Sequence, residues 1–86
     1  MHKAKEYIKH LDPDAREEML LEIPGRYGSI LWLHYCTGLK LTEVADAMHY
    51  SYEWVRHMHQ RALNKVYSLH KSEIEAWLKT RHKKPP

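Results

Sequence analysis

Polar and charged side chains recur between residues 53 and 64 at a spacing that gathers them on one side of a helix. A helix advances about 100° per residue, so four of these side chains point about 140° to 200° away from Val55: Glu53, His57, Gln60 and Asn64. Three larger side chains flank this polar face: Trp54, Arg56 and Arg61. In the major groove of DNA, arginine can pair with guanine, glutamine or asparagine with adenine, and a carboxylate can accept from cytosine. We therefore expect this face to read double-stranded DNA, with Glu53 either contacting a base or orienting Arg56 or Arg61.

An apolar row on the other side of the same segment predicts that the helix is anchored in a protein core. Its members repeat at i, i+3, i+7, i+11 and i+14: Val55, Met58, Ala62, Val66 and Leu69. Ser51 precedes the row and is a favourable N-cap, because its hydroxyl can accept from backbone N–H groups of the first turn. The pattern predicts a helix that follows Ser51 and reaches about Leu69, with its N-terminal half in the groove.

The ten residues before Ser51 have the composition of a short helix followed by a tight turn. Thr42 can cap this helix, and Ala45 is small where the next helix must pass close to it. His49 stands where glycine is usual, and histidine is among the residues enriched at positive φ. Tyr50 supplies the apolar residue of the turn. These features predict a helix-turn-helix over about residues 41–69, and ten residues are its predicted DNA contacts: Thr42, Ser51, Tyr52, Glu53, Trp54, Arg56, His57, Gln60, Arg61 and Asn64.

Amphipathic spacing and helix breakers predict three more helices in the first forty residues. The first has a four-residue apolar face: Ala4, Tyr7, Ile8 and Leu11. Asp12 is expected to be the N-cap of the second helix, with Pro13 at its first position. Pro24-Gly25 then breaks the chain. An apolar third helix is expected from about Arg26 to Thr37, closed by Gly38 in the left-handed conformation.

The C-terminal part predicts one more short helix. Ser72 and Glu75 have the spacing of a capping box, and three apolar residues would face inward: Ile74, Trp77 and Leu78. Residues 81–86 are basic and are expected to form a flexible tail. The whole chain, residues 1–86, is therefore predicted to be one all-α domain, a compact bundle of about five to six short helices.

Composition and charge agree with one small domain that meets a polyanion. The 86 residues are 43% hydrophobic and 29% charged, which is usual for a globular domain. Residues 1–50 have six Lys/Arg and eight Asp/Glu, whereas residues 51–86 have eight and three, so the basic half contains the polar face. Cys36 is the only cysteine, which rules out an internal disulfide and favours a reducing compartment. Without a long apolar run, we expect a cytoplasmic protein with no membrane partner.

The other aromatic and metal-binding residues favour structural roles over catalysis. His57 and His59 point about 200° apart on a helix, and Cys36 has no C-x-x-C partner, so neither a metal nor another cofactor is expected. No spacing of nucleophile, base or phosphate loop predicts an enzyme. His59 is expected to pack at the edge of the core, as Trp32 and Trp77 are expected to pack within it. Trp54 can contact a thymine methyl, cover the preceding helix or meet another protein.

The stretch from Ile30 to Leu69 resembles region 4 of the sigma-70 family, where an L-x-x-x-x-G segment precedes a helix with threonine near its start and an A-x-x-M/L segment, followed by an S-x-x-x-V-R helix. The matching residues here are Leu33, Gly38, Thr42, Val44, Ala45, Met48, Ser51, Val55, Arg56, Arg61, Ala62, Leu63 and Lys65. The resemblance implies that Glu53, Arg56 and His57 meet bases or phosphates of a −35 promoter element. Tyr52 and Trp54 depart from the arginine-rich character of the family at these places, so a promoter preference is not implied.

The same resemblance implies a role in transcription outside a complete sigma factor. The region of that family that melts promoters and binds the polymerase core has no counterpart here, so we expect an activator, repressor or accessory factor. Short sigma-like regulators of this kind occur in phages and prophages. Two other interpretations remain open: a module that binds RNA polymerase or a sigma factor, and an accessory protein that marks DNA for phage packaging or recombination. A homodimer is also considered, through the apolar face of the first helix or that of the last.

Overall fold

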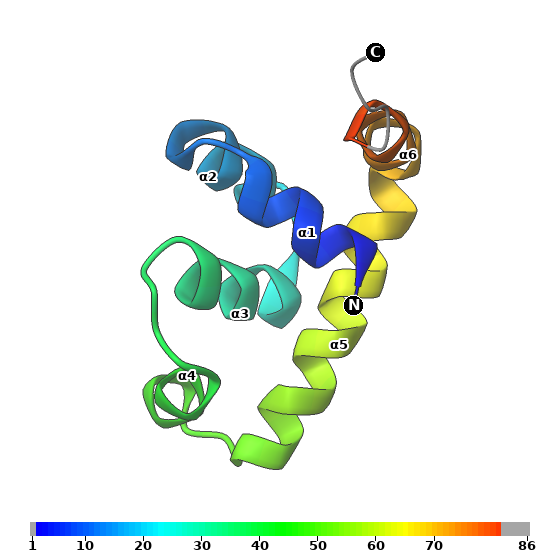
Figure 1. Ribbon diagram of the computed structural model, residues 1–86. Coiled ribbons are helices and arrows are strands. Elements are labelled where there is room, and N and C mark those ends of the chain that lie inside the picture. The colour runs from blue at the N-terminus through cyan, green and yellow to red at the C-terminus, as the bar shows by residue number, and fades with distance from the viewer. Residues whose placement is uncertain (1, 82–86) are drawn as a thin grey trace.

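The computed structural model describes residues 2–81, and within this range it contains six helices and no strand. The helices are α1 (Lys3–His10), α2 (Pro13–Leu21), α3 (Gly25–Tyr35), α4 (Leu41–Met48), α5 (Tyr52–Leu69) and α6 (Lys71–Arg81). In Figure 1, α3 lies between α2 and α4, and α5 runs beside α3 and α4. The prediction of an all-α bundle of five to six helices is confirmed. Arg81 ends α6, and the rest of the predicted flexible tail, 82–86, lies outside the described residues.

Several helix ends lie where short-range signals in the sequence predicted them. The Asp12 carboxylate accepts a 2.9 Å hydrogen bond from the Ala15 N–H, and the Ser51 hydroxyl accepts one of 3.1 Å from the Trp54 N–H. Gly38 has a φ of 79°, as expected of a glycine that closes a helix. These contacts satisfy N–H and C=O groups that a helix leaves unpaired at its ends.

Two capping predictions were wrong. Thr42 lies inside the first turn of α4, because the helix begins at Leu41 and Lys40 occupies the N-cap position. The Glu43 carboxylate, rather than a hydroxyl, stabilises this end by accepting a 2.9 Å hydrogen bond from the Lys40 backbone N–H. Ser72 is not a cap either, because α6 already begins at Lys71, after a single intervening residue, His70.

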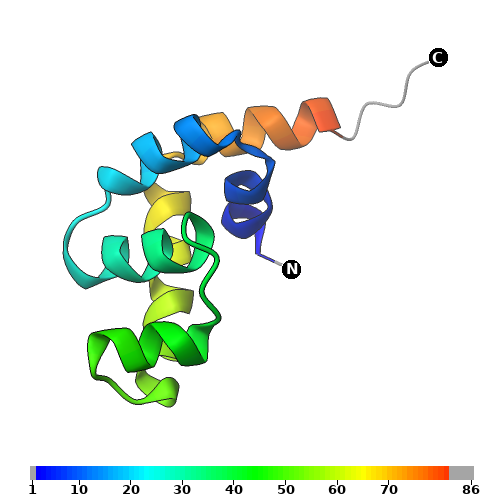
Figure 2. The same cartoon turned by 90° about the vertical axis from the view of Figure 1, so that its left-hand side faces the viewer.

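The interior consists of two apolar clusters that share α3 and α5. The larger cluster joins five helices through ten buried side chains: Ala4, Ile8, Met19, Leu20, Ile23, Leu31, Ala62, Leu63, Val66 and Ile74. The smaller one attaches α4 to α3 and α5: Ile30, Val44, Ala45 and Val55. Half-buried side chains surround this second cluster, among them Met48, Trp54 and Met58. The short helix α4 is therefore held in place by α3 and α5 alone, at one end of the molecule (Figures 1 and 2).

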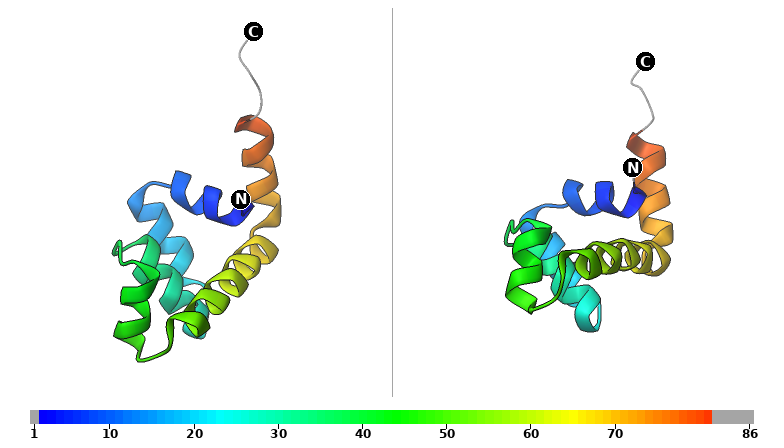
Figure 3. Two further views of the ribbon diagram at one scale, coloured as in Figure 1. Left: turned by 60° about the horizontal axis from the view of Figure 1, so that its bottom comes forward. Right: turned by 90° about the horizontal axis from the view of Figure 1, so that it is seen from below.

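Helix α6 leaves the end of α5 at a bend and packs on α1 (Figures 2 and 3). Ala4, Ile8 and Ile74 are fully buried in the same cluster, and the ring of Trp77 meets that of Tyr7 edge-on at 5.7 Å. The apolar faces of the first and last helices thus cover each other within one chain. A homodimer would need a different surface from the two that the sequence suggested.

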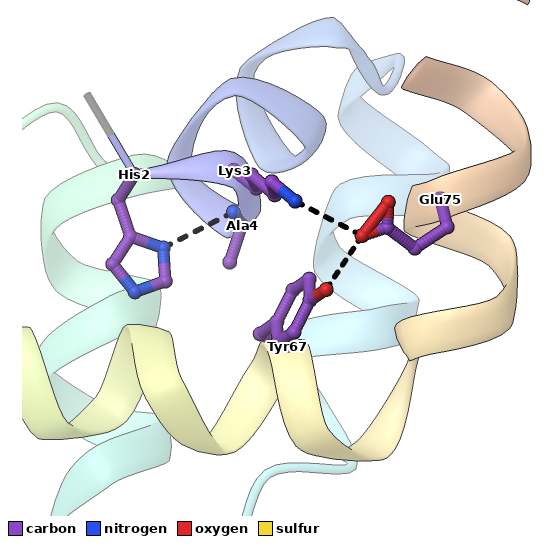
Figure 4. Close-up of polar contacts among 5 residues, drawn as sticks. All are labelled: His2, Lys3, Ala4, Tyr67 and Glu75. Carbon is purple, nitrogen blue, oxygen red and sulfur yellow. Dashed lines mark hydrogen bonds and ion pairs between the residues drawn. The ribbon is translucent and has the colours of Figure 1, made fainter. Parts of the chain in front are cut away.

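Polar contacts reinforce this junction of α1, α5 and α6 (Figure 4). The Glu75 carboxylate accepts a 2.6 Å hydrogen bond from the Tyr67 hydroxyl and a 3.1 Å bond from the Lys3 ammonium group. His2 caps α1 by accepting from the Ala4 N–H at 3.1 Å. Glu75 therefore fixes α6 to its neighbours, and it takes no part in the capping box that the sequence indicated. Leu69, at the end of α5, was expected in the core but is 52% exposed, because the bend at His70 carries α6 away from it.

Arg16 of α2 connects the C-terminal ends of two other helices. Its guanidinium group donates to four backbone carbonyl oxygens, those of Ile8 (3.0 Å), Lys9 (3.1 Å), Leu11 (2.9 Å) and Tyr35 (3.2 Å). The last carbonyls of a helix have no partner within it, so they need one from elsewhere. One side chain therefore satisfies the end of α1 and part of the end of α3.

Candidate nucleic-acid interface

A three-residue turn, 49–51, joins α4 to α5. His49 has φ 60° and ψ 40°, the left-handed conformation expected for this position, and its N–H bonds to the Asp46 carbonyl at 3.3 Å. The Tyr50 N–H then bonds to the Ala45 carbonyl at 3.0 Å. These bonds close α4 and reverse the chain, so that α5 starts beside α4 with its first turn capped by Ser51.

The two sides of α5 differ sharply in exposure. Val55, Ala62 and Val66 are fully buried, whereas the predicted polar face lies wholly at the surface: Glu53, His57, Gln60 and Asn64 are all exposed. The flanking cations Arg56 and Arg61 are exposed too. The first half of α5 lies at the end of the molecule occupied by α4, away from α1, α2 and α6 (Figure 1). A ligand as large as a DNA duplex could therefore approach this half of α5 without contacting α1, α2 or α6.

Glu53 and Arg56 form an ion pair within the polar face. The two side chains lie 2.9 Å apart, one helical turn from each other, and both are mostly exposed. The hydrogen bond from Arg56 lowers the pKa of Glu53, and the same bond raises the pKa of Arg56. The sequence offered Arg56 and Arg61 as partners of Glu53. Glu53 pairs with Arg56 and therefore orients this side chain, and it does not pair with Arg61. A surface pair of this kind adds little stability, but it restricts where the guanidinium group points.

Asn64 lies apart from the other polar residues of the face. Its side-chain oxygen is 2.7 Å from Nε2 of His2, at the start of α1. This contact places Asn64 beside the N-terminal helix, about two turns beyond the region where Glu53, Arg56 and His57 come together.

Trp54 adopts one of the three roles that the sequence left open. Its ring stacks on that of Tyr50, with centroids 4.1 Å apart and an interplanar angle of 24°, and it packs against the smaller apolar cluster. Trp54 therefore covers the junction of α4 and α5. Tyr52, by contrast, is 43% exposed and lies on the surface of the first turn.

His59 is more deeply buried than an edge residue, at 9% exposure. Its Nε2 lies 2.8 Å from the Tyr35 hydroxyl, and its ring meets that of His34 edge-on at 5.3 Å. Burial is the largest cause that lowers the pKa of His59 to about 4, and the nearby His34, Lys5 and His2 contribute to the same decrease. His59 is therefore a neutral structural residue, and the exposed His57 is the histidine available to a ligand.

Arg26 belongs to this surface although the sequence gave no sign of it. Its guanidinium carbon lies 5.5 Å from the centre of the Tyr50 ring, which places the start of α3 beside the turn between α4 and α5. An open hollow of about 380 Å³ adjoins it and is lined by Pro24, Gly25, Arg26, Tyr27, Met58 and Lys65. Arg26 and Lys65 are 39 residues apart in the chain, so no local spacing rule could have connected them.

Other classes of site find no support in the part of the chain that the structure describes. Among residues 2–81, no three side chains of His, Cys, Asp or Glu come close enough to share a metal ion. No described helix combines the length and apolarity that a bilayer crossing requires.

Comparison with known proteins found no matching family model, no matching curated protein and no matching solved structure.

Proposed function

We propose that this chain is a sequence-specific double-stranded DNA-binding protein that regulates transcription by placing the first half of α5 in the major groove. The single observation that supports this most strongly is the division of α5 into a fully buried face and an exposed polar face on its free side. Helices positioned in this way by a preceding short helix and a tight turn are the DNA-reading elements of helix-turn-helix proteins.

The exposed residues suit distinct tasks in such a complex. Arg56, oriented by Glu53, would pair with guanine, and Gln60 one turn later has the amide group that can read adenine. His57 lies between them and can donate or accept. Arg61 flanks the face and suits a phosphate oxygen.

The beginnings of the two helices suit contacts with the DNA backbone. Thr42 is exposed in the first turn of α4, where free backbone N–H groups and the helix dipole favour a phosphate. Ser51 is also exposed, and because its oxygen accepts from Trp54, its own O–H remains free to donate. Contacts of this kind position a protein on DNA without reading its sequence.

The resemblance to region 4 of the sigma-70 family gives this proposal its biological setting. It favours a small phage or prophage regulator that acts at promoters in the bacterial cytoplasm. The Glu53–Arg56 pair lies at two of the positions that the resemblance assigned to promoter contacts.

Matched substitutions on the two faces of α5 test the proposal. A duplex selected from genomic fragments is compared with a random duplex, and the affinity ratio measures sequence reading. Arg56→Ala should reduce this ratio about 5- to 150-fold, which corresponds to the usual discrimination of about 1–3 kcal/mol for one bidentate base contact. Ser68→Ala alters an exposed residue near the other end of α5 and serves as the control. An affinity ratio that Arg56→Ala leaves unchanged would show that Arg56 does not read a base.

One observation favours a second candidate function, binding to RNA polymerase or a sigma factor. Tyr50 and Tyr52 are 36% and 43% exposed beside Trp54, and aromatic residues of this kind are enriched at protein interfaces. In that case Tyr52→Ala should weaken capture of purified polymerase holoenzyme while leaving DNA affinity unchanged. A loss of DNA affinity instead would place Tyr52 in the DNA-binding surface.

A further inference from the structure

The unpaired cations of α5 itself lie on one flank of the helix. From the helical period, Arg61 and Lys65 point about 240° and 280° away from Val55, and Lys65 lines the hollow at the start of α3. Arg26 adds a third cation to this flank. None of the three lies within salt-bridge distance of a carboxylate in the described part of the chain, whereas Arg56 and Lys3 are each paired with a glutamate. The flank therefore has positive charge that no described acidic group neutralises.

Arg26 both lines the hollow and contacts an aromatic row beside it. Its guanidinium group lies over the Tyr50 ring, and Tyr50 in turn stacks on Trp54 in the first turn of α5. This row ties the position of Arg26 to that of the helix that we propose enters the groove. Lys65, which also lines the hollow, comes from α5 itself. Both cations are therefore connected to α5, Arg26 through the aromatic row and Lys65 through the chain.

The rest of the hollow leaves room for a phosphate group. Tyr27 and Met58 are half-buried and make part of its wall apolar. Pro24 provides no side-chain hydrogen bond to the N–H groups at the start of α3. The space around Gly25 is open, since a Cβ added there would meet no atom within 4 Å. A phosphate oxygen can therefore reach both the cations and the backbone.

We propose that this hollow receives one phosphate of the DNA backbone, held jointly by Arg26 and Lys65. The inference rests on the proposed function for the nature of its ligand. Backbone contacts fix the register and orientation of a protein on the duplex. Arg26 and Lys65 would thus set how α5 lies in the groove, without reading any base.

The test measures the affinity of the full chain for duplex DNA as a function of salt. The variants are Arg26→Gln, Lys65→Gln and the double variant, and Lys79→Gln removes one exposed positive charge on α6 as the control. Each neutralised phosphate contributes about 0.9 to the slope of log affinity against log salt. The double variant should therefore lower the slope by about 0.9, which corresponds to about a 3.5-fold smaller loss of affinity between 50 and 200 mM salt. Lys79→Gln should leave the slope unchanged.

The salt slope should decrease equally for the selected duplex and for a random one, because a phosphate contact is independent of sequence. Arg26→Lys keeps the charge and should retain most of the slope. Thermal melting of each variant shows whether a loss of affinity reflects unfolding. A slope unchanged in the double variant would overturn the inference, and a decrease of about 1.8 would mean two separate contacts and overturn the shared site.

The design separates this inference from the proposed function. If the protein binds every duplex equally and the double variant still lowers the slope, the phosphate site stands and sequence reading fails. If the selected duplex is preferred and the slope does not change, sequence reading stands and the phosphate site fails. Absence of binding to any duplex would overturn both.

Discussion

Acid should destabilise this protein through His59. The folded chain keeps this ring neutral, with a pKa of about 4, because it is buried against Tyr35 and faces His34 of α3 and the cationic Lys5 of α1. In the unfolded chain the same ring takes up its proton near the ordinary value of 6.5. Between these two pH values the unfolded state binds one more proton than the folded state. The stabilising effect is therefore complete above about pH 6.5 and is lost as the pH falls towards 4.

The size of the effect follows from the separation of the two pKa values. A difference of about 2.5 units corresponds to about 3 kcal/mol at 1.36 kcal/mol per unit. The ring edge keeps some contact with water, which screens part of the interaction, so we expect about 1–2 kcal/mol between pH 7 and pH 4.5. For a small domain this is a substantial fraction of a total stability of about 5–15 kcal/mol.

Urea denaturation followed by tryptophan fluorescence measures this difference. Carboxylates also titrate in this range, so the relevant quantity is the excess loss of stability in the wild-type protein over His59→Gln. His57→Gln removes an exposed ring from the same helix and should lose as much stability as the wild type. If His59→Gln loses as much stability as the wild type on acidification, the buried neutral ring is not the cause and the reasoning is wrong.

Three further substitutions test how the helices are held together. Arg16→Ala should lower the free energy of unfolding by about 3 kcal/mol or more, because several carbonyl groups lose a charged donor; a loss below 1 kcal/mol in urea denaturation would show that water replaces it. Gly28→Ala should destabilise the domain by several kcal/mol and lower the melting temperature, because its Cβ would collide with the Ile23 carbonyl oxygen. His49→Gly should raise the free energy of unfolding by about 0.5–1 kcal/mol by relieving a positive φ; a decrease would mean that the histidine side chain stabilises the turn.

Local patterns in the sequence were sufficient to predict the helices and most of their ends. Asp12 and Ser51 act on N–H groups three residues away, so the chain segment itself contains both partners. The left-handed conformation of His49 followed from its place in the turn, where glycine is usual. Burial of Val55 and exposure of His57 followed from the helical period alone.

Features that depend on contacts between distant segments were not predictable in this way. Arg16 bonds to carbonyls up to 19 residues away, and Arg26 meets Tyr50 only after α3 has packed beside the turn. Leu69 continues the apolar period of α5 but lies beyond its last packing partner. Glu75 has the spacing of a capping residue, yet Lys3 and Tyr67 bind it instead. In each case the deciding partner comes from another element.

Selection of genomic fragments by the purified protein at near-physiological salt, followed by sequencing of the retained DNA, tests the central proposal most directly. The proposal that α5 reads the major groove predicts one or a few related sites, bound at least about 10³-fold more tightly than random DNA. Enrichment that never exceeds the salt-sensitive background would contradict it and favour a protein partner for this surface.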